Sequence, residues 1–150
     1  VETADQMFKA TQDNLPADVA IFSAAIADFK IKEKNKKKIK KADYINLNLE
    51  KNIDIINYVS NHNSLRPKLV IGFAAETDDL KNNARKKLIE KNCDWMIAND
   101  VSNKLIGFDS DFNEVIIFYK DKKINEEKLV MKKKSEISDE IVDRVISQLN

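Results

Sequence analysis

Residues Leu69–Asp100 read LVIGFAAETDDLKNNARKKLIEKNCDWMIAND, and this stretch decides the fold. Short apolar runs at its two ends, Leu69–Phe73 and Asp94–Ala98, predict buried strands. Between them, one apolar residue recurs every four positions, which predicts a helix with a stripe made of Leu80, Ala84 and Leu88. Two buried strands joined by such a helix pair in parallel through a right-handed crossover. The stretch therefore predicts a β-α-β unit.

The two ends of the expected helix carry charge. Thr77 is predicted to cap its start, with Asp78 and Asp79 in the first turn, where acidic side chains favour the helix N-terminus. Lys87 and Lys91 follow four residues apart and so share one face. Because α/β folds hold anionic ligands at turns after strand ends, these lysines are either part of an anion site or ordinary exposed helix lysines, which is the interpretation that the pair favours in isolation.

Composition describes a single domain with a highly charged surface. The chain has 150 residues, of which 43% are hydrophobic and 34% charged, and a formal net charge of +1. A charge so near zero gives little support to a polyanion-binding protein. One cysteine fits a reducing compartment, and no apolar run approaches the roughly 20 residues that span a membrane. With no visible signal peptide, we expect a cytoplasmic protein without membrane contact.

Glycine is scarce, with only Gly72 and Gly107 present, so no glycine-rich phosphate loop exists in this sequence. A doubly wound nucleotide-binding domain normally carries such a loop after its first strand. The first residue is Val1, and a helical pattern begins almost at once. We therefore expect residues 1–150 to be the C-terminal portion of one domain whose glycine-rich part lies before them.

The first third of the chain predicts a helix at Thr3–Asp13, capped by Thr3, and then a continuously apolar, buried strand at Asp18–Ala25. Small residues at the end of this strand would let a ligand approach the backbone closely. Asp28 places a carboxylate there, as a ligand contact or as a turn cap.

A lysine-rich run, Lys30–Lys41, holds eight lysines among twelve residues and predicts an exposed loop. It is either a solvated loop or a flap that closes on phosphates. Tyr44–Leu49 alternates and predicts a half-exposed strand, with Ile45, Leu47 and Leu49 on one face. Asn52–Asn61 predicts a helix whose inward residues are Ile53, Ile56, and Val59 or Ser60.

The C-terminal third predicts an antiparallel hairpin and a last helix. Glu114–Tyr119 and Glu127–Met131 flank the turn Asp121–Lys123. Ser138 is expected to cap the final helix, with Ile141, Val145 and Leu149 facing inward. The whole pattern predicts a three-layer, Rossmann-like α/β fold with a parallel central sheet and an antiparallel hairpin extension.

Several single residues suit ordinary structural roles better than chemistry. His62 fits a surface loop, Asn99-Asp100 a turn that bonds its own backbone, and Cys93 a small packing residue without a basic partner. No Cys or His spacing typical of metal ligands is present, so we expect no protein metal site.

Taken in order, six segments resemble one family: SAAIADF, KKKIKK, KNIDII, IGFAAET, ARKKLIEKNCDWMIANDVS and GFDSDFNEV. They are similar to the bacterial phosphopantothenoylcysteine synthetases, in which the segments read approximately AAVADF, EKIKK, KNPDI, VGFAAET, ARKKL-x-x-K-x-x-D followed by ANDVS, and GF-x-x-D-x-N. The resemblance covers nearly the whole chain. It departs at Ile53, where the family has proline, which puts the local backbone shape in question.

The resemblance implies a ligase that uses CTP to join 4'-phosphopantothenate to L-cysteine through an acyl-cytidylate, in coenzyme A biosynthesis. It also implies a homodimer, with Mg²⁺ bound mainly through the nucleotide phosphates. FMN would be present only if the protein is fused to a flavin-dependent decarboxylase. Lys38 matches the family's functional lysine and is the expected catalytic residue. The expected CTP contacts, besides Lys38, are Phe22, Ser23, Ala24, Asp28, Ile53, Asp54, Ile55, Ile56, Phe73, Lys87 and Lys91.

Two other classes compete with the ligase. A nicotinamide-dependent dehydrogenase needs a glycine fingerprint and an acid after its second strand, and both are absent from the sequence. A nucleic-acid-binding module would use the Lys30–Lys41 loop, which lacks the aromatic residues that usually accompany such a surface. We therefore expect no nucleic-acid partner.

Overall fold

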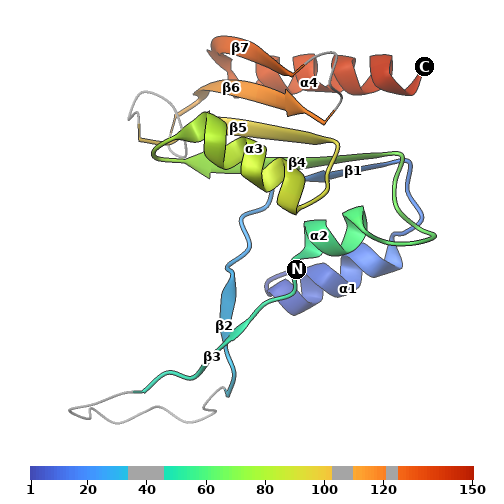
Figure 1. Cartoon of the computed structure of the whole chain (residues 1–150), viewed down its shortest axis with the longest axis vertical. Helices are drawn as coiled ribbons and strands as arrows, with labels where there is room; N and C mark the ends of the chain where they lie inside the picture. The colour runs from blue at the N-terminus through green and yellow to red at the C-terminus, as the bar shows by residue number, and fades with distance from the viewer. Residues whose placement is uncertain (34–45, 103–109, 121–124) are drawn as a thin grey trace.

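The computed structural model describes residues 1–33, 46–102, 110–120 and 125–150. Its centre is a five-stranded sheet in the order β1-β4-β5-β6-β7 (Figure 1). Three strands run parallel, namely β1 (Val19–Phe22), β4 (Leu69–Glu76) and β5 (Trp95–Asp100). The antiparallel hairpin of β6 (Phe112–Tyr119) and β7 (Glu126–Lys133) extends the sheet beyond β5. This architecture confirms the predicted α/β class and its hairpin extension.

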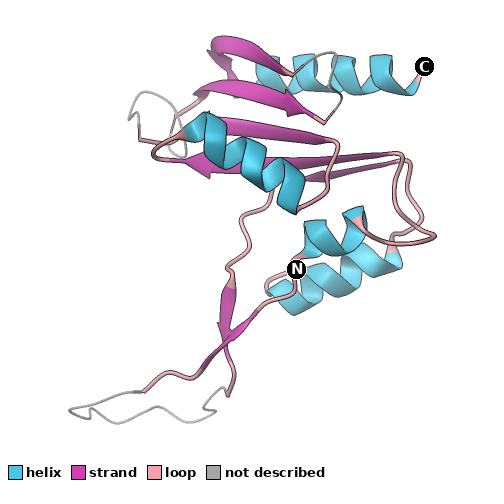
Figure 2. Cartoon of the chain, in the orientation of Figure 1, coloured by secondary structure: helices cyan, strands magenta, loops and turns pink. Residues whose placement is uncertain are grey.

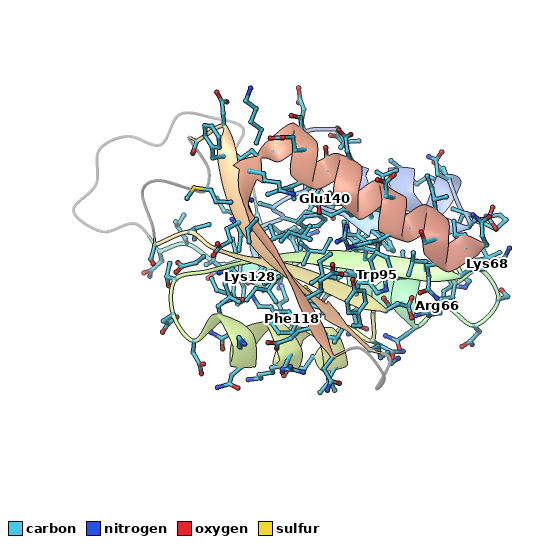
Figure 3. The ribbon with its side chains drawn as sticks, turned by 90° about the horizontal axis from the view of Figure 1, so that it is seen from above. Arg66, Lys68, Trp95, Phe118, Lys128 and Glu140 are labelled. Atoms are coloured by element: carbon cyan, nitrogen blue, oxygen red, sulfur yellow. The ribbon has the colours of Figure 1, made fainter. Side chains whose placement is uncertain are left out.

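Helices cover both faces of the sheet (Figures 2 and 3). On one face lies α4 (Lys134–Leu149), which packs over a core that includes Ile71, Trp95, Ile97 and Ile117. The other face carries α2 (Ile55–Ser60) and α3 (Leu80–Glu90), and α1 (Ala4–Asp13) packs beside α2. None of the helices in the described ranges is both long and apolar enough to cross a membrane.

The central β-α-β unit forms as predicted, with β4 and β5 parallel and α3 packed against both. At the amino end of this unit, Arg66 pairs with both carboxylate oxygens of Asp94 at 2.9 and 3.0 Å. Asp94 in turn accepts the backbone N–H of Val70 at 2.7 Å. This bonding fixes where the two strands begin.

The start of α3 differs from the prediction, because β4 continues through Glu76 and occupies residues expected in the turn. The helix then begins at Leu80, and its N-cap is Asp79 instead of Thr77. Asp79 adopts a left-handed conformation with φ of 40°, which aspartate tolerates better than most residues. The predicted cap of α1 is correct, since Thr3 and Gln6 form a capping box.

The strand predicted at Asp18–Ala25 is shorter and less buried than expected. As β1, it spans Val19–Phe22 at the edge of the sheet in the described residues, where Ile21 is 47% exposed. An apolar run predicts burial only where strands pair on both sides, so the prediction of a central strand was wrong here.

Two helix predictions placed the start of the helix wrongly. The helix predicted at Asn52–Asn61 is α2, which starts only after its N-cap Asp54. Ile53 therefore lies outside the helix and is 49% exposed, whereas Ile55 and Val59 are buried. In the last helix, Lys133 is the N-cap, and Ser138 lies one turn inside. The predicted inward residues Ile141 and Val145 are buried, whereas Leu149 at the helix end is 45% exposed.

A two-stranded ribbon leaves the body of the molecule below the sheet (Figure 1). It pairs β2 (Phe29–Ile31) with β3 (Leu49–Lys51), which begins later than the strand predicted at Tyr44–Leu49. Lys30, the first lysine of the predicted loop, lies in β2 and is half-buried between Asp5 at 2.8 Å and Glu50 at 3.6 Å. Hydrogen bonding to Asp5 raises the pKa of Lys30. Residues 34–45, which hold most of the lysine run, lie outside the described residues.

Candidate functional site

The carboxyl ends of β1, β4 and β5 meet at one edge of the sheet, as parallel strands require. The pairing of β1 with β4 ends at Phe22 and Gly72, while β4 continues over Phe73–Glu76 along β5. The chain leaves β1 at this point and turns away from the sheet (Figure 1). A step therefore forms at the sheet edge, next to Phe22 and Phe73, two of the site residues expected from the sequence.

Asn52 joins two of the segments that the sequence placed in the site. Its backbone N–H donates to the carbonyl oxygen of Asp28 at 2.8 Å, and its side-chain amide donates to the carbonyl oxygen of Ala27 at 2.7 Å. The segment after β1, which includes Ser23, Ala24 and Asp28, is thereby tied to the residues just before α2. Ser23, Ala24 and Asp28 are exposed, so they are accessible to a ligand.

Sequence reasoning missed Asn52. Its carbonyl oxygen Oδ1 is buried and accepts no hydrogen bond from the described residues. The available signal was its position directly before the Ile53–Ile56 segment. Asparagine at a segment boundary has many structural uses, so this signal alone did not identify a bridging role.

Lys91 and Asp54 form an ion pair between two predicted site residues. Lys91 is the C-cap of α3, and its Nζ lies 2.5 Å from Asp54 Oδ2. The other carboxylate oxygen of Asp54 accepts the N–H of Asn57 and so caps α2. A second link between these helices runs from the Asn57 side chain to the Glu90 carbonyl oxygen at 3.1 Å. The start of α2 is therefore held against the end of α3.

Lys87 meets a carboxylate that the sequence analysis did not include. Its Nζ lies 2.7 Å from Oε1 of Glu76, the last residue of β4. Glu76 is buried, and the Lys87 side chain is 42% exposed. The ammonium group is thus held at the sheet edge with access to solvent. Glu76 appears in the sequence only as one acid among three after an apolar run, which is why it was not singled out.

Phe73 lies on the other side of the sheet from this ion pair. Side chains alternate along a strand, and Ala74 and Glu76 face the α2–α3 side together with Gly72. Phe73 therefore faces the α4 side, where it is 39% exposed. Hydrogen bonds of Asn52 and the ion pair of Lys91 link the segments that contain Asp28, Asp54 and Lys91. Phe73 lies on the opposite face of the sheet. The expected catalytic residue Lys38 lies outside the described residues.

Asp100, His62 and Cys93, for which the sequence analysis predicted ordinary structural roles, have such roles in the structure. Asp100 Oδ1 accepts both the N–H and the hydroxyl of Ser102, which makes the predicted turn after β5. His62 Nδ1 accepts the N–H of Leu65 at 3.1 Å within its loop. Cys93 is fully buried, and this burial raises the pKa of its thiol to about 11, so little nucleophilic thiolate forms near neutral pH.

Comparison with known proteins identifies relatives over the whole chain. The family described as DNA/pantothenate metabolism flavoprotein C-terminal domain matches residues 1–149. The coenzyme A biosynthesis bifunctional protein CoaBC of Haemophilus influenzae is 36% identical over 150 residues, covering 99% of this chain and 36% of that protein. CoaBC of Bacillus subtilis is 37% identical over 147 residues, covering 97% of this chain and 35% of that protein. The chain thus spans about a third of the length of these relatives.

Solved structures agree in fold. The crystal structure of the C-terminal domain of a CoaBC protein superimposes with a TM-score of 0.72 at 30% identity, covering 99% of this chain and 64% of that one. The DNA/pantothenate metabolism flavoprotein from Streptococcus pneumoniae gives the same TM-score at 21% identity, covering 100% of this chain and 70% of that one, and it supports the fold alone. The resemblance stated from the motifs is confirmed: the chain belongs to the DNA/pantothenate metabolism flavoprotein C-terminal domain family.

Proposed function

We propose that this chain is part of a coenzyme A biosynthesis enzyme and carries its CTP-dependent phosphopantothenate–cysteine ligase site. The names of the bacterial relatives support the pathway. The ligase chemistry rests on the motif resemblance and on one structural observation. Two lysines match the family's CTP contacts, Lys87 in α3 and Lys91 at its C-cap, and each is held by a carboxylate.

The proposed chemistry needs cations at this edge of the sheet. The carboxylate of 4'-phosphopantothenate attacks the α-phosphate of CTP, which is surrounded by negative oxygens, and pyrophosphate leaves. L-cysteine then displaces CMP from the acyl-cytidylate. One ammonium 4 Å from a phosphate oxygen supplies on the order of 4 kcal/mol of attraction at an effective dielectric near 20. Lys87 and Lys91 are proposed to supply two such ammonium groups, and Lys38 is proposed to act on the transferring phosphates.

Mg²⁺ is assigned to the nucleotide in this proposal. The described ranges hold no cluster of three or more His, Cys, Asp or Glu arranged for a metal ion. The assignment rests on the resemblance, which implies that the ion is bound mainly through the phosphates of CTP. The exposed carboxylate of Asp28 is proposed to contact the nucleotide, at the ribose or at a magnesium-bound phosphate.

A homodimer is also proposed. The β2–β3 ribbon extends from the body, and an isolated two-stranded ribbon is only marginally stable in water. Phe29, Ile31 and Leu49 lie on one of its faces and are 42–57% exposed. A second copy of the ribbon would cover this face.

Calorimetric titration of the full-length protein with CTP, ATP and a short oligonucleotide tests the proposed function. CTP should bind more tightly than ATP, and Lys91→Gln should weaken CTP binding about tenfold, since a charge-assisted contact is lost. Lys86→Gln is the matched control, because Lys86 is an exposed lysine of the same helix whose partner Glu90 is also exposed. If the oligonucleotide binds instead, without preference for CTP and with a steep dependence on salt, the chain is a nucleic-acid-binding module and the ligase proposal is wrong.

A further inference from the structure

The ion pair of Glu76 with Lys87 is unlike the other ion pairs of α3. Glu76 is only 9% exposed. Among the described residues, the buried polar or charged ones are Glu76 and Ser60. The remaining partners of α3 lysines and arginine are more exposed, namely Asp54, Glu90 and Glu126. Here the carboxylate lies inside and the ammonium lies between it and solvent. Glu76 therefore holds the Lys87 ammonium group from the protein interior, while the lysine side chain remains partly exposed to solvent.

This pair is poorly suited to stabilising the fold. Although Lys87 Nζ lies 2.7 Å from Oε1, that oxygen accepts no well-directed hydrogen bond from the described residues. A buried carboxylate with one oxygen that accepts no directed hydrogen bond loses solvation that one ion pair barely offsets, and an apolar side chain is often the more stable choice at such a position. The arrangement of Glu76 therefore suits control over where the Lys87 ammonium lies.

The strand also places Glu76 where such control matters. It is the last residue of β4 and pairs with Asp100 at the end of β5, and its carbonyl oxygen accepts the N–H of Val101 at 2.9 Å. Its backbone is thus fixed by pairing with the end of β5. A carboxylate on rigid strand backbone restrains a long lysine side chain better than a carboxylate on a loop, because less of the geometry can relax.

We propose that Glu76 is a positioning residue that holds the ammonium of Lys87 at the carboxyl edge of the sheet, ready for the phosphates of the nucleotide. This inference rests on the proposed function and adds a residue to it. Glu76 acts through Lys87 and does not itself contact the nucleotide, because its negative charge would repel the phosphates.

The proposal predicts that Glu76→Gln slows acyl-cytidylate formation without weakening CTP binding. Glu76→Gln keeps the size of the side chain but removes the charge that restrains Lys87. The rate of acyl-cytidylate formation should fall on the order of tenfold or more, since small displacements of a catalytic group are costly. The dissociation constant for CTP should stay unchanged or become smaller, because the carboxylate competes with phosphate for the same ammonium. If Glu76 were needed only for folding, Glu76→Gln would lower the rate and weaken CTP binding together.

The experiment measures single-turnover pyrophosphate release and CTP binding for the full-length protein and four variants. These are Glu76→Gln, Glu76→Asp, Lys87→Gln and the double variant Glu76→Gln/Lys87→Gln. Glu76→Asp retains the charge and should recover part of the lost rate. The double variant should be no slower than Lys87→Gln alone, because Glu76 acts only through that lysine. Glu90→Gln, an exposed carboxylate of the same helix, is the control and should leave the rate unchanged.

NMR of the lysine side-chain ¹⁵N signals provides a readout that does not need activity. The Lys87 ammonium should be restrained in the unliganded wild type and released in Glu76→Gln. Equal restraint in both, or multiplicative rate losses in the double variant, would overturn the role of Glu76. Absence of acyl-cytidylate in the wild type would instead refute the proposed function, and the NMR comparison would still decide whether Glu76 positions Lys87.

Discussion

At the scale of single residues, Gly72 is a point at which Ile56 of α2 packs against β4. A Cβ atom at this position would lie 2.6 Å from Cδ1 of Ile56 and 3.0 Å from Cε of Met96. Ile56 belongs to the segment expected to contact the nucleotide. The missing side chain of Gly72 therefore lets that segment lie directly on β4, next to the point where β1 ends.

Gly72→Ala should lower the free energy of unfolding by about 1–3 kcal/mol, because the added methyl group must displace the end of a packed side chain. The penalty should be smaller in an Ile56→Val background, in which the nearest methyl group is absent. Urea denaturation of the four proteins measures both values. If the cost of Gly72→Ala is the same in both backgrounds, the contact with Ile56 does not set it.

Lys38 is the residue on which the proposed chemistry depends most. If its ammonium stabilises charge that develops in the transition state, Lys38→Gln in the full-length enzyme should slow acyl-cytidylate formation about a hundredfold or more. Lys36→Gln should cost much less, since the sequence predicts an exposed loop there, in which a lysine is screened and replaceable. Single-turnover pyrophosphate release, with CTP binding alongside, measures both. Equal and weak effects would mean that the lysine run is only a basic patch, without a catalytic role for Lys38.

At the scale of elements, α4 is attached to the hairpin by charge as well as by its apolar face. Arg144 of α4 donates to both carboxylate oxygens of Glu127 on β7, and the Tyr119 hydroxyl donates to the same carboxylate at 2.8 Å. A second pair joins Lys132 to Glu140. The hydrogen bond from Arg144 is the main reason why the pKa of Glu127 lies below its ordinary value. Burial raises the pKa of Tyr119 to about 12.

This network predicts a pH dependence of stability. The pKa of Glu127 is lower in the folded protein than in the unfolded chain, so its stabilising contribution is present above the unfolded pKa near 4.5. The contribution is lost as the pH falls through the lower, folded value. Glu127→Gln should therefore show a shallower loss of stability below about pH 4.5 than wild type. Thermal melts across acidic pH measure it, with Asp139→Asn, an exposed carboxylate of α4, as control. Parallel curves for wild type and Glu127→Gln would contradict the prediction.

At the scale of the whole molecule, the exposed apolar face of the β2–β3 ribbon predicts self-association. Leu49→Lys places a charge on that face, opposite Ile31, and should convert a dimer into monomers, as measured by analytical ultracentrifugation of the full-length protein. Ile89→Lys is the matched control, because Ile89 is 76% exposed on α3, away from the ribbon. A wild-type protein that stays monomeric at high concentration would refute the dimer.

The sequence by itself determined the order and type of the main elements. Apolar runs and four-residue spacing between Leu69 and Asp100 were sufficient to predict the parallel β-α-β unit, and alternation after Glu114 was sufficient to predict the hairpin. These signals are local, because each strand or helix must bury its own apolar face. The expected site residues came instead from the resemblance of six short segments to one family. Their family is confirmed, while the roles of the individual residues remain proposals.

Only the tertiary structure decided which side chains meet. Lys91 and Asp54 are 37 residues apart, and Asn52 and Ala27 are 25 apart. No local pattern encodes such pairs, since they depend on how the crossover lays α3 and α2 across the sheet. The partnership of Glu76 with Lys87 likewise depends on β4 pairing with β5 to its last residue. The exposure of β1 was decided at the same level, because the burial of a strand depends on its neighbours in the sheet and not on its own apolar residues.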